Sequence, residues 1–351
     1  MKVIKILLSF TALFILIFIV FIVYFTLTDY KPAEKIEIFD SKVPDTLSIY
    51  SIYSVISWNI GYCGLNAQMD FFYDGGKKVY PEYSVVLNNL KNIIKQLKDF
   101  TENNDFILLQ EVDINSRRSY FINQVSEIQQ ALNKKMEIMF ALNYKVNFVP
   151  VPVSKPMGKV ESGISILTKY KPLKAYRISL PSDYPWPKKL FMLDRCCLIA
   201  YIPVNNNRYF VMINTHNSAY DDGSLRMLQN QKLKNLVLEE YSKGNYVLIG
   251  GDWNQIPSDF KPQYLDEIYD STYYSMSIPD TFPDKEWKVC YDNKIPSNRS
   301  TAISYVKGKT PVTTIDFFIV SPNIEVINIE NINLNFKFSD HNPVKLMFRL
   351  L

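Results

Sequence analysis

The chain has 351 residues, of which 47% are hydrophobic and 21% are charged, a composition typical of a folded protein and not of a disordered one. Without Lys2 and Lys5, 37 basic residues stand against 35 acidic ones, so the rest of the chain carries only about +2. Strong binding to nucleic acid usually needs a larger basic excess, so the charge argues against a dedicated DNA enzyme, although a local basic patch would escape this count.

Residues 1–29 are predicted to form a membrane anchor. Lys2 and Lys5 precede an uncharged apolar run at residues 6–28, and about 20 such residues cross a bilayer core. A cleavable signal peptide is the alternative, but its apolar region is usually about 7–15 residues long and ends in small residues, whereas this run ends in bulky ones such as Tyr24. The lysines predict a cytoplasmic N-terminus with the rest of the chain outside the cytoplasm. If the segment is cleaved, the protein is instead secreted.

Residues 30–50 are polar and proline-containing and are predicted to be a tether, followed by one domain at residues 51–351. Apolar residues at helical spacing predict helices at residues 82–100 and 224–241. Short apolar runs bounded by Asn, Asp, Gly or Pro predict strands at residues 53–58, 106–109, 164–167, 196–202, 209–213, 246–249, 315–320 and 344–348. Strands mixed with helices indicate an α/β or α+β domain.

Four cysteines are too few for a disulfide scaffold and lack the C-x-x-C spacing of a zinc site. The neighbours Cys196 and Cys197 fall in an apolar run and are interpreted as small buried residues on a strand. A disulfide of Cys63 or Cys290 in an oxidising compartment stays open at this point.

Polar side chains capable of chemistry follow many of the predicted strands. Each one alone has a structural explanation, such as capping a turn, but six such segments are hard to attribute to turns. Both histidines of the chain belong to this set, and strand ends are where sites gather in α/β folds. The segments are ISWN with Asn59, LLQE with Glu111, INTH with His216, IGGDWN with Asp252 and Asn254, TTIDF with Asp316, and SDHNP with Asp340 and His341.

These residue types fit metal-assisted hydrolysis of a phosphodiester. Carboxylates and carboxamides are oxygen donors that suit Mg²⁺, with Mn²⁺ as a second candidate, and two histidines with scattered cysteines argue against zinc. Hydrolysis needs an activated water, neutralised phosphoryl oxygens and a stabilised leaving oxygen. Asp340 and His341 offer a metal ligand and a proton-handling group from one loop, and Asp316 can orient His341 as the acid of a catalytic triad orients its histidine.

The order WN, QE, TH, GDWN, ID and SDH resembles the endonuclease/exonuclease/phosphatase superfamily over residues 55–348. GDWN and SDHNP are the specific parts of this resemblance. It implies a four-layer sandwich of two packed mixed β-sheets flanked by helices, and a metal-dependent phosphodiesterase or nuclease. It also implies that Glu111 is the principal Mg²⁺ ligand, with Asn59 and Asp340 on the metal side.

The same resemblance implies catalytic roles. Asp252 corresponds to the residue that positions or deprotonates the attacking water, and Asn254 to its phosphate-binding companion. His216 corresponds to a histidine at the scissile phosphate or the leaving group. Asp316 and His341 correspond to the family's Asp and His pair, and the general base stays open between Asp252 and His341.

Substrate contacts are less defined. Arg226, in the first turn of the second predicted helix, is either a phosphate-binding residue or a solvated arginine, and Trp186, in a proline-stiffened loop, belongs to a lid, a membrane-facing wedge or an ordinary surface loop. YDGG at residues 73–76 is interpreted as a turn, or else as an edge of the site. The preferred substrate is a phospholipid headgroup or similar phosphodiester; the alternatives are DNA or RNA, and a catalytically silent binding module on the same fold. The oligomeric state is not predicted.

Overall fold

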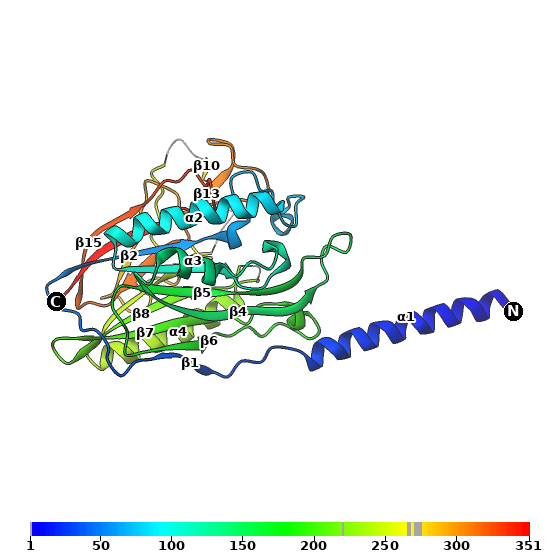
Figure 1. Cartoon of the computed structure of the whole chain (residues 1–351), viewed down its shortest axis with the longest axis horizontal. Helices are drawn as coiled ribbons and strands as arrows, with labels where there is room; N and C mark the ends of the chain where they lie inside the picture. The colour runs from blue at the N-terminus through cyan, green and yellow to red at the C-terminus, as the bar shows by residue number, and fades with distance from the viewer. Residues whose placement is uncertain (1, 220, 265–267, 270–275) are drawn as a thin grey trace.

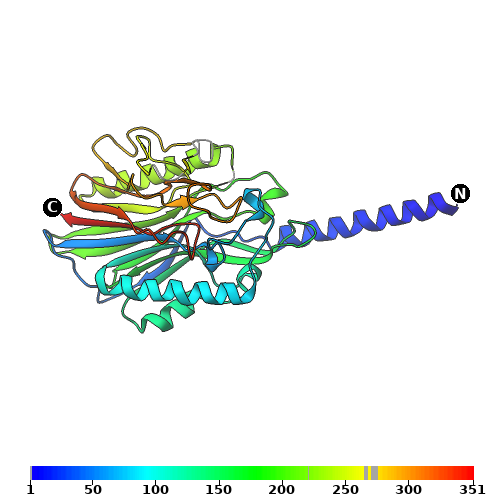
Figure 2. The same ribbon diagram turned by 90° about the horizontal axis from the view of Figure 1, so that it is seen from above.

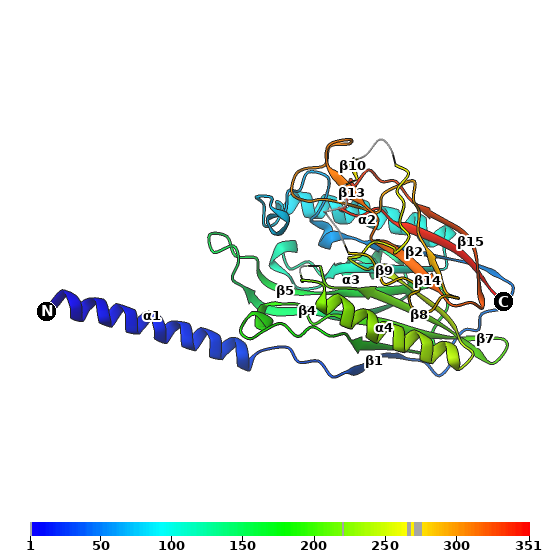
Figure 3. The ribbon, with the colours of Figure 1, turned by 180° about the vertical axis from the view of Figure 1, so that it is seen from behind.

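Two β-sheets packed face to face form the centre of the protein, and helices cover their outer faces (Figures 1 and 2). The computed structural model describes residues 2–219, 221–264, 268–269 and 276–351. Helices α2 and α3 lie on one sheet and α4 lies on the other, which confirms the predicted four-layer sandwich. An apolar helix, α1, extends from one end of the sandwich (Figures 1 and 3).

Most predicted elements lie at or near their predicted positions. The helices are α1 (Lys2–Leu27), α2 (Tyr83–Asn103), α3 (Gln124–Leu132) and α4 (Ser224–Ser242), with short 3-10 helices η1 (Gly61–Cys63), η2 (Phe72–Asp74), η3 (Arg117–Ser119) and η4 (Lys188–Phe191). The first eight strands are β1 (Lys35–Asp40), β2 (Ile52–Asn59), β3 (Phe106–Asp113), β4 (Glu137–Val149), β5 (Gly158–Thr168), β6 (Lys174–Ser179), β7 (Cys196–Val204) and β8 (Arg208–His216). The remaining strands are β9 (Tyr246–Asp252), β10 (Ile268–Tyr269), β11 (Lys288–Cys290), β12 (Asn298–Arg299), β13 (Pro311–Thr313), β14 (Asp316–Val320), β15 (Ile324–Asn331) and β16 (Val344–Leu350).

Both large sheets are mixed. One has the strand order β1-β6-β7-β8-β9-β14-β11 and the other the order β15-β16-β2-β3-β5-β4, while β10, β13 and β12 form a small third sheet. Within the large sheets, β2 pairs with β3 and β8 pairs with β9 in parallel, and the other pairs are antiparallel. The carboxyl ends of two parallel strands meet at the same edge of a sheet, so each sheet brings two strand ends together.

The central strands are apolar on both faces because both faces are covered. In β3, Phe106 and Leu108 face the core between the sheets, whereas Ile107 and Leu109 pack with the helical layer of α2 and α3. Side chains alternate between the two faces of a strand, so a strand covered twice is a continuous apolar run. This burial explains why the strands were recognisable in the sequence without polar alternation.

The segment predicted as a polar tether, residues 30–50, is in part a strand of the sheet. Within it, β1 pairs antiparallel with β6, and Leu47 is fully buried in the core between the sheets. Ser179 of β6 already holds this segment at Ala33, whose carbonyl oxygen accepts a hydrogen bond from the Ser179 hydroxyl. The alternation of Ile36 and Ile38 in this short strand was masked by the charged residues around them.

Within the described residues, α1 is the one helix that is long and apolar enough to cross a membrane. Almost all of its surface is exposed, and only Ile22 and Phe25 are buried. Its last turns pack against η4, where the rings of Phe25 and Phe191 lie 5.3 Å apart. A signal sequence would have the same length and composition, so the helix by itself does not decide between an anchor and a cleaved leader.

All four cysteines are buried and carry free thiols, which answers the question about Cys63 and Cys290. Burial raises the pKa of the Cys63 thiol well above its usual value and that of Cys290 to about 12. A thiol that keeps its proton is a poor nucleophile and a poor metal ligand. The cysteines therefore serve as small core residues.

A buried polar link ties the two sheets together. Gln110 of β3 donates from Nε2 to Asn214 Oδ1 of β8 at 2.7 Å. Asn214 in turn donates from Nδ2 to the carbonyl oxygens of Leu109 and Ser165, at 2.9 and 2.8 Å. Both side chains are fully buried, so these bonds fix the relative position of the two sheets one residue before Glu111.

We expect Asn214→Ala to destabilise the protein by about 1–3 kcal/mol, because it removes the 2.7 Å hydrogen bond of the buried Gln110 amide and leaves only the 3.2 Å bond to Ser57 Oγ. Urea unfolding of the purified chain measures the free energy of unfolding. The control is Asn147→Ala, an exposed asparagine on β4, which we expect to change this free energy by no more than about 0.5 kcal/mol. Equal effects of the two substitutions would show that the polar link does not stabilise the sandwich.

Candidate active site

The predicted site residues come together at one end of the sandwich. Asn59 ends β2 and Glu111 lies on the neighbouring β3, both in the six-stranded sheet. His216 and Asp252 end the paired strands β8 and β9 of the other sheet and lie directly opposite each other. Asp316 opens β14 and pairs with Asp252, so residues far apart in the sequence become neighbours. The loop before β16 adds Asp340 and His341.

Asp252 is a buried carboxylate at the centre of this group. Asn59 donates from Nδ2 to Asp252 Oδ2 at 2.9 Å, and the backbone N–H of Asn254 donates to Oδ1 at 3.0 Å. The Nε2 atoms of His216 and His341 lie 3.5 and 3.7 Å from Asp252 Oδ2. Burial raises the pKa of Asp252 well above its usual range, the charge of His341 opposes this rise, and the charge of Asp316 adds to it.

His341 is oriented from both sides of its ring. Its Nδ1 lies 2.7 Å from Asp316 Oδ2, and the same oxygen accepts a hydrogen bond from Ser297 Oγ at 2.7 Å. Its Nε2 lies 2.9 Å from Asn298 Nδ2, a residue that the sequence did not single out. Burial alone would lower the pKa of His341, but the charges of Asp316, Asp340 and Asp252 raise it. His341 is therefore a cation at neutral pH. The Nε2 of a charged ring can only donate, so the Asn298 amide then turns Oδ1, which is buried without a partner, toward it.

His216 has the opposite character. Burial and the nearby charge of Arg195 lower the pKa of His216 well below its usual value, so the ring is neutral. Its Nδ1 is buried and has no hydrogen-bond partner among the described residues. The site thus places one charged and one neutral imidazole against the same oxygen of Asp252.

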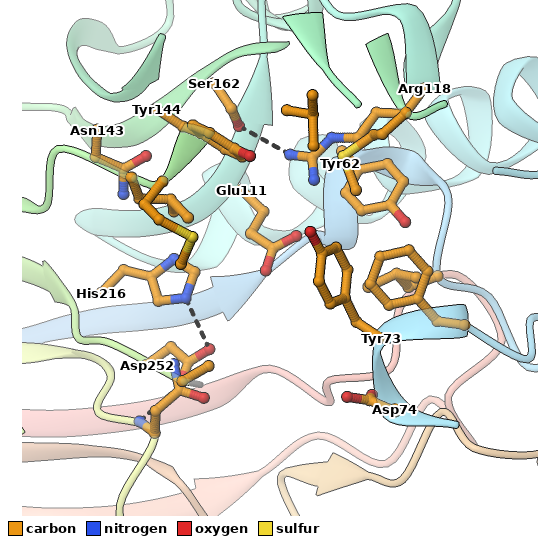
Figure 4. A pocket seen from close by; sticks show the side chains of 18 of the residues that line it. Tyr62, Tyr73, Asp74, Glu111, Arg118, Asn143, Tyr144, Ser162, His216 and Asp252 are labelled. Atoms are coloured by element: carbon orange, nitrogen blue, oxygen red, sulfur yellow. Dashed lines mark hydrogen bonds and ion pairs between the residues drawn. The ribbon is translucent and has the colours of Figure 1, made fainter. Parts of the chain in front are cut away.

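Glu111 points into the cavity because β3 contains a bulge. The pairing of β3 with β5 shifts between Leu109 and Val112, so two residues of β3 stand opposite one of β5. Glu111 has a φ of 53°, which non-glycine residues seldom adopt, and a bulge of this kind re-aims a side chain. Figure 4 shows its carboxylate between Tyr73 and His216. Asn59 Nδ2 lies 3.3 Å from Glu111 Oε1 and so bridges Glu111 and Asp252.

Glu111 and Asp340 fit a divalent cation. Both line the cavity, and within the described part of the chain neither forms an ion pair with a lysine or arginine. Burial raises the pKa of Asp340 to about 6; the charge of His341 opposes this rise and the charge of Glu111 adds to it. A cation would offset this repulsion, and one or two carboxylates are the usual protein ligands of Mg²⁺. Asn59 directs Oδ1 to the Gly61 N–H, so its role as a ligand stays a prediction.

Asp252, Asp316 and His341 also offer ligand atoms, all within 4.8 Å of one another. However, Asp316 Oδ2 is already held by His341 Nδ1 and Ser297 Oγ. A cation at this place would have to displace the proton between the His341 ring and Asp316. These three residues are better suited to hold a proton than a metal, whereas Glu111 and Asp340 have no such bond between them.

A cavity of about 430 Å³ opens above these residues, a size common for small-molecule sites (Figure 4). Its floor is polar, and much of its wall is apolar or aromatic. Residues of the wall that sequence analysis missed are Tyr62, Leu65, Phe71, Tyr144, Val149, Met157, Phe191 and Leu193. Tyr73 and Asp74 also line the cavity, so the YDGG segment borders the site as well as forming a turn.

Two buried arginines in the cavity wall were also missed. Arg118 forms two hydrogen bonds with Asp113, at 3.0 and 3.1 Å, and its guanidinium lies over the ring of Tyr62, so its charge is already paired. Arg195 donates from Nη1 to the carbonyl oxygen of His216 at 3.2 Å and, among the described residues, has no carboxylate partner within 4 Å. Arg195 is thus a free buried cation facing the site. In the sequence, Arg195 could have been noticed only as a charged residue directly before the apolar run of β7.

Arg226 is buried, so its interpretation as a solvated arginine is wrong. It is not among the residues that line the cavity, and a contact with phosphate stays a prediction. Its Nε lies 2.7 Å from Asp221 Oδ1, and its Nη1 donates to the carbonyl oxygen of Asn254 at 2.9 Å. Asn254 itself has a φ of 50° and donates from Nδ2 to the carbonyl oxygen of Asn217. Arg226 therefore supports the turn that presents Asn254.

Trp186 lies outside the cavity lining, in the loop before η4. The residue is 57% exposed, and its Nε1 lies 3.4 Å from the hydroxyl oxygen of Thr26 in α1. The loop therefore borders the end of α1. A direct contact of Trp186 with substrate stays a prediction.

Comparison with known proteins agrees with this geometry. A family model described as endonuclease/exonuclease/phosphatase family matches residues 56–341. No curated protein matches the chain. Among solved structures, an endonuclease/exonuclease/phosphatase from Beutenbergia cavernae DSM 12333 is similar with a TM-score of 0.59 at 16% identity, over 85% of this chain and 72% of that one.

Two further structures share the fold. ANGEL2, a 2′,3′-cyclic phosphatase in complex with adenosine-2′,3′-vanadate, has a TM-score of 0.54 at 15% identity, over 85% of this chain and 96% of that one. The human Nocturnin catalytic domain with a bound sulfate anion has a TM-score of 0.53 at 15% identity, over 88% of this chain and 98% of that one. At these identities the likeness concerns the fold alone.

We expect Asp316→Asn to lower the pKa of His341, because it removes the negative charge that does most to hold the ring proton. The chain has only two histidines, so NMR titration of the imidazoles in chelator-treated protein resolves both, and His216→Gln assigns them. Asp99→Asn, on the exposed face of α2, is the charge-matched control. An unchanged His341 titration in Asp316→Asn would contradict the pairing.

Proposed function

Because the chain belongs to the endonuclease/exonuclease/phosphatase family, we propose that it is a membrane-anchored, Mg²⁺-dependent phosphodiesterase acting on a phospholipid headgroup or similar small phosphodiester. The observation that carries the proposal is the setting of Asp252. Its carboxylate lies between Asn59 and both imidazoles, in the same cavity as Glu111 and Asp340. Mn²⁺ is the alternative cation.

The proposed reaction adds water to phosphorus in line with the leaving oxygen, so one P–O ester bond breaks and a phosphomonoester and an alcohol form. A divalent cation at Glu111 and Asp340 would neutralise the phosphoryl oxygens. Asp252 accepts the proton of the attacking water, and its raised pKa suits a base near neutral pH. His341, charged and held by Asp316, stabilises the negative charge that grows on the phosphoryl group.

The neutral His216 and the free Arg195 complete the set. His216 lies within 3.5 Å of Asp252 and can contact the scissile phosphate or the leaving oxygen. The guanidinium of Arg195 provides a permanent positive charge in the cavity wall, and its geometry suits phosphate oxygens. Asn254, fixed by Arg226 and Asn217, provides an amide for the same oxygens. The sequence left the general base open between Asp252 and His341; the proposed mechanism assigns it to Asp252, with the charged His341 as its partner.

Features of the N-terminus support a membrane location, and the net charge and the cavity wall support a lipid-like substrate. Helix α1 exposes a long apolar surface. Contact of this surface with water is unfavourable, and a bilayer would cover it. Lys2 and Lys5 before it favour a cytoplasmic N-terminus with the domain on the other side. The small net charge and the apolar cavity wall favour a small amphiphilic diester over a long polyanion.

We expect Asp252→Asn to reduce kcat on a soluble phosphodiester, bis(p-nitrophenyl) phosphate, by about 10²- to 10⁴-fold, the usual contribution of a positioned acid or base. A chelator should abolish turnover, and Mg²⁺ or Mn²⁺ should restore it. Asp99→Asn is the control and should match the native chain. Turnover that persists with a chelator would contradict the metal dependence. Absence of turnover under every condition would contradict the hydrolase and favour a catalytically silent binding module.

Arg195→Met tests the free cation. Loss of a charge-assisted bond to the phosphate should lower kcat/KM by about 10- to 100-fold, with partial recovery in Arg195→Lys. Arg208→Met removes the same charge from an exposed position at the start of β8, far from the site, and should have no effect. Equal kinetics for the two methionine variants would remove Arg195 from the proposal.

The substrate class is tested with the native chain against sphingomyelin-type lipids in mixed micelles, DNA and RNA. We expect turnover of the lipid headgroup and little cleavage of nucleic acid. Robust cleavage of DNA or RNA without lipid turnover would instead make the chain an extracytoplasmic nuclease using the same residues.

A further inference from the structure

The apolar wall of the cavity is one continuous cluster. Tyr62, Tyr144, Val149 and Met157 belong to a buried apolar group beside the polar site, and Phe191 and other partly buried residues pack against it. The Tyr144 hydroxyl donates to the carbonyl oxygen of Phe191 at 3.0 Å and so ties η4 to this wall. A phosphate group does not need such a wall, whereas an apolar chain attached to the phosphate does.

The same wall continues into α1. The ring of Phe191, which lines the cavity, lies 5.3 Å from the ring of Phe25 and 6.1 Å from that of Phe21. Phe25 is one of the two residues of α1 that are buried. One side of the Phe191 segment therefore faces the site, and the other side holds the end of the apolar helix.

The connection between helix and domain is too short to separate them. Helix α1 ends at Leu27, and the carbonyl oxygens of Ala33 and Glu34 already accept hydrogen bonds from Ser179 in β6. The intervening residues 28–32 span at most about 20 Å when fully extended. A bilayer that contains α1 must therefore lie close to the end of the domain where the cavity opens.

The rim of the cavity at this end has the residues expected at a membrane surface. In the loop that joins β4 and β5, Val151 lines the cavity and Val153 is 87% exposed. Figures 1 and 3 show this loop projecting toward the side from which α1 leaves. Trp186 lies in the loop before η4, and Lys188 opens η4. Exposed tryptophans and lysines are frequent at the interface between water and lipid.

We propose that the cavity opens onto the membrane that contains α1, and that its apolar wall receives the hydrocarbon chain of a phosphodiester lipid drawn from that same bilayer. This inference rests on the proposed function for its chemistry, and on the contact between Phe191 and α1 for its geometry. Helix α1 is then a part of the lipid entrance as well as an anchor. Val153 and Trp186 lie at the lipid surface, outside the reacting groups.

The membrane contact is tested without catalysis. Trp58 and Trp253 are fully buried and Trp287 nearly so, so Trp186 is the tryptophan that lipid can reach. In the full chain reconstituted into vesicles of brominated phosphatidylcholine, we expect quenching of its fluorescence and loss of that quenching in Trp186→Phe. Tyr50→Trp in the Trp186→Phe background puts an exposed ring near the C-terminus, at the opposite end, and should stay unquenched. Equal quenching of the native chain and Trp186→Phe would overturn the proposal.

Access from the same bilayer is tested with a fluorescent phosphodiester lipid placed either in the vesicles that hold the protein or in separate vesicles. We expect at least about tenfold faster turnover in the shared vesicles, because the anchor raises the effective concentration. Val153→Asp should slow this turnover severalfold and leave bis(p-nitrophenyl) phosphate hydrolysis unchanged. Val43→Asp, an exposed valine beyond the far end of β1, should change neither.

The outcomes separate the two proposals. Normal hydrolysis of the soluble diester, together with equal rates for shared and separate vesicles, overturns the membrane-facing cavity and leaves the hydrolase standing. The same holds if Val153→Asp has no effect on lipid turnover. Absence of soluble-diester hydrolysis overturns the hydrolase, and with it lipid turnover by this site.

Discussion

The alignment of two parallel strand pairs is the constraint on which the site depends. Strands β2 and β3 of one sheet lie against β8 and β9 of the other, and the buried bond between Gln110 and Asn214 holds the two sheets in this relation. A small slip between the sheets would separate Asn59 from Asp252, which are 193 residues apart in the chain. The chemistry of the site therefore rests on how the sandwich is packed.

Burial gives each carboxylate and imidazole in the site its character. Asp252 lies in the interior between a charged and a neutral imidazole, and the difference between the imidazoles follows from their neighbours. His341 is hydrogen-bonded to the carboxylate of Asp316. His216 has no such bond to Asp316 and lies beside the positively charged Arg195. Glu111 and Asp340 have the remaining negative charge, which is why a cation suits that side of the cavity.

Helix α1 ends beside the apolar wall of the cavity. A domain on a long flexible tether could meet a substrate from any direction, but β1 fixes the chain to the sheet a few residues after the helix. The ring contacts between α1 and Phe191 then place the helix end next to the cavity. In the proposed membrane-anchored protein, packing and the shortness of this connection would orient the cavity to the bilayer.

The sequence by itself determined the fold class and most of the polar set. Strands that are covered on both faces must be apolar throughout. A polar residue directly after such an apolar run, such as Asn59, Glu111, His216 or Asp252, was therefore easy to recognise. The anchor candidate was equally clear, because its signal is local composition. The same local view failed at β1, where two apolar positions among charges carried too little signal.

Only the tertiary structure decided which side chains meet. Arg226 is buried beneath Asn254, although its position on a helix allowed a solvated side chain. Arg195, Asn298 and Phe191 have no local motif, and they enter the site because distant segments pack around it. Local sequence fixes the period and polarity of each element, whereas the contacts between elements depend on the packing of the whole core, which no single segment encodes.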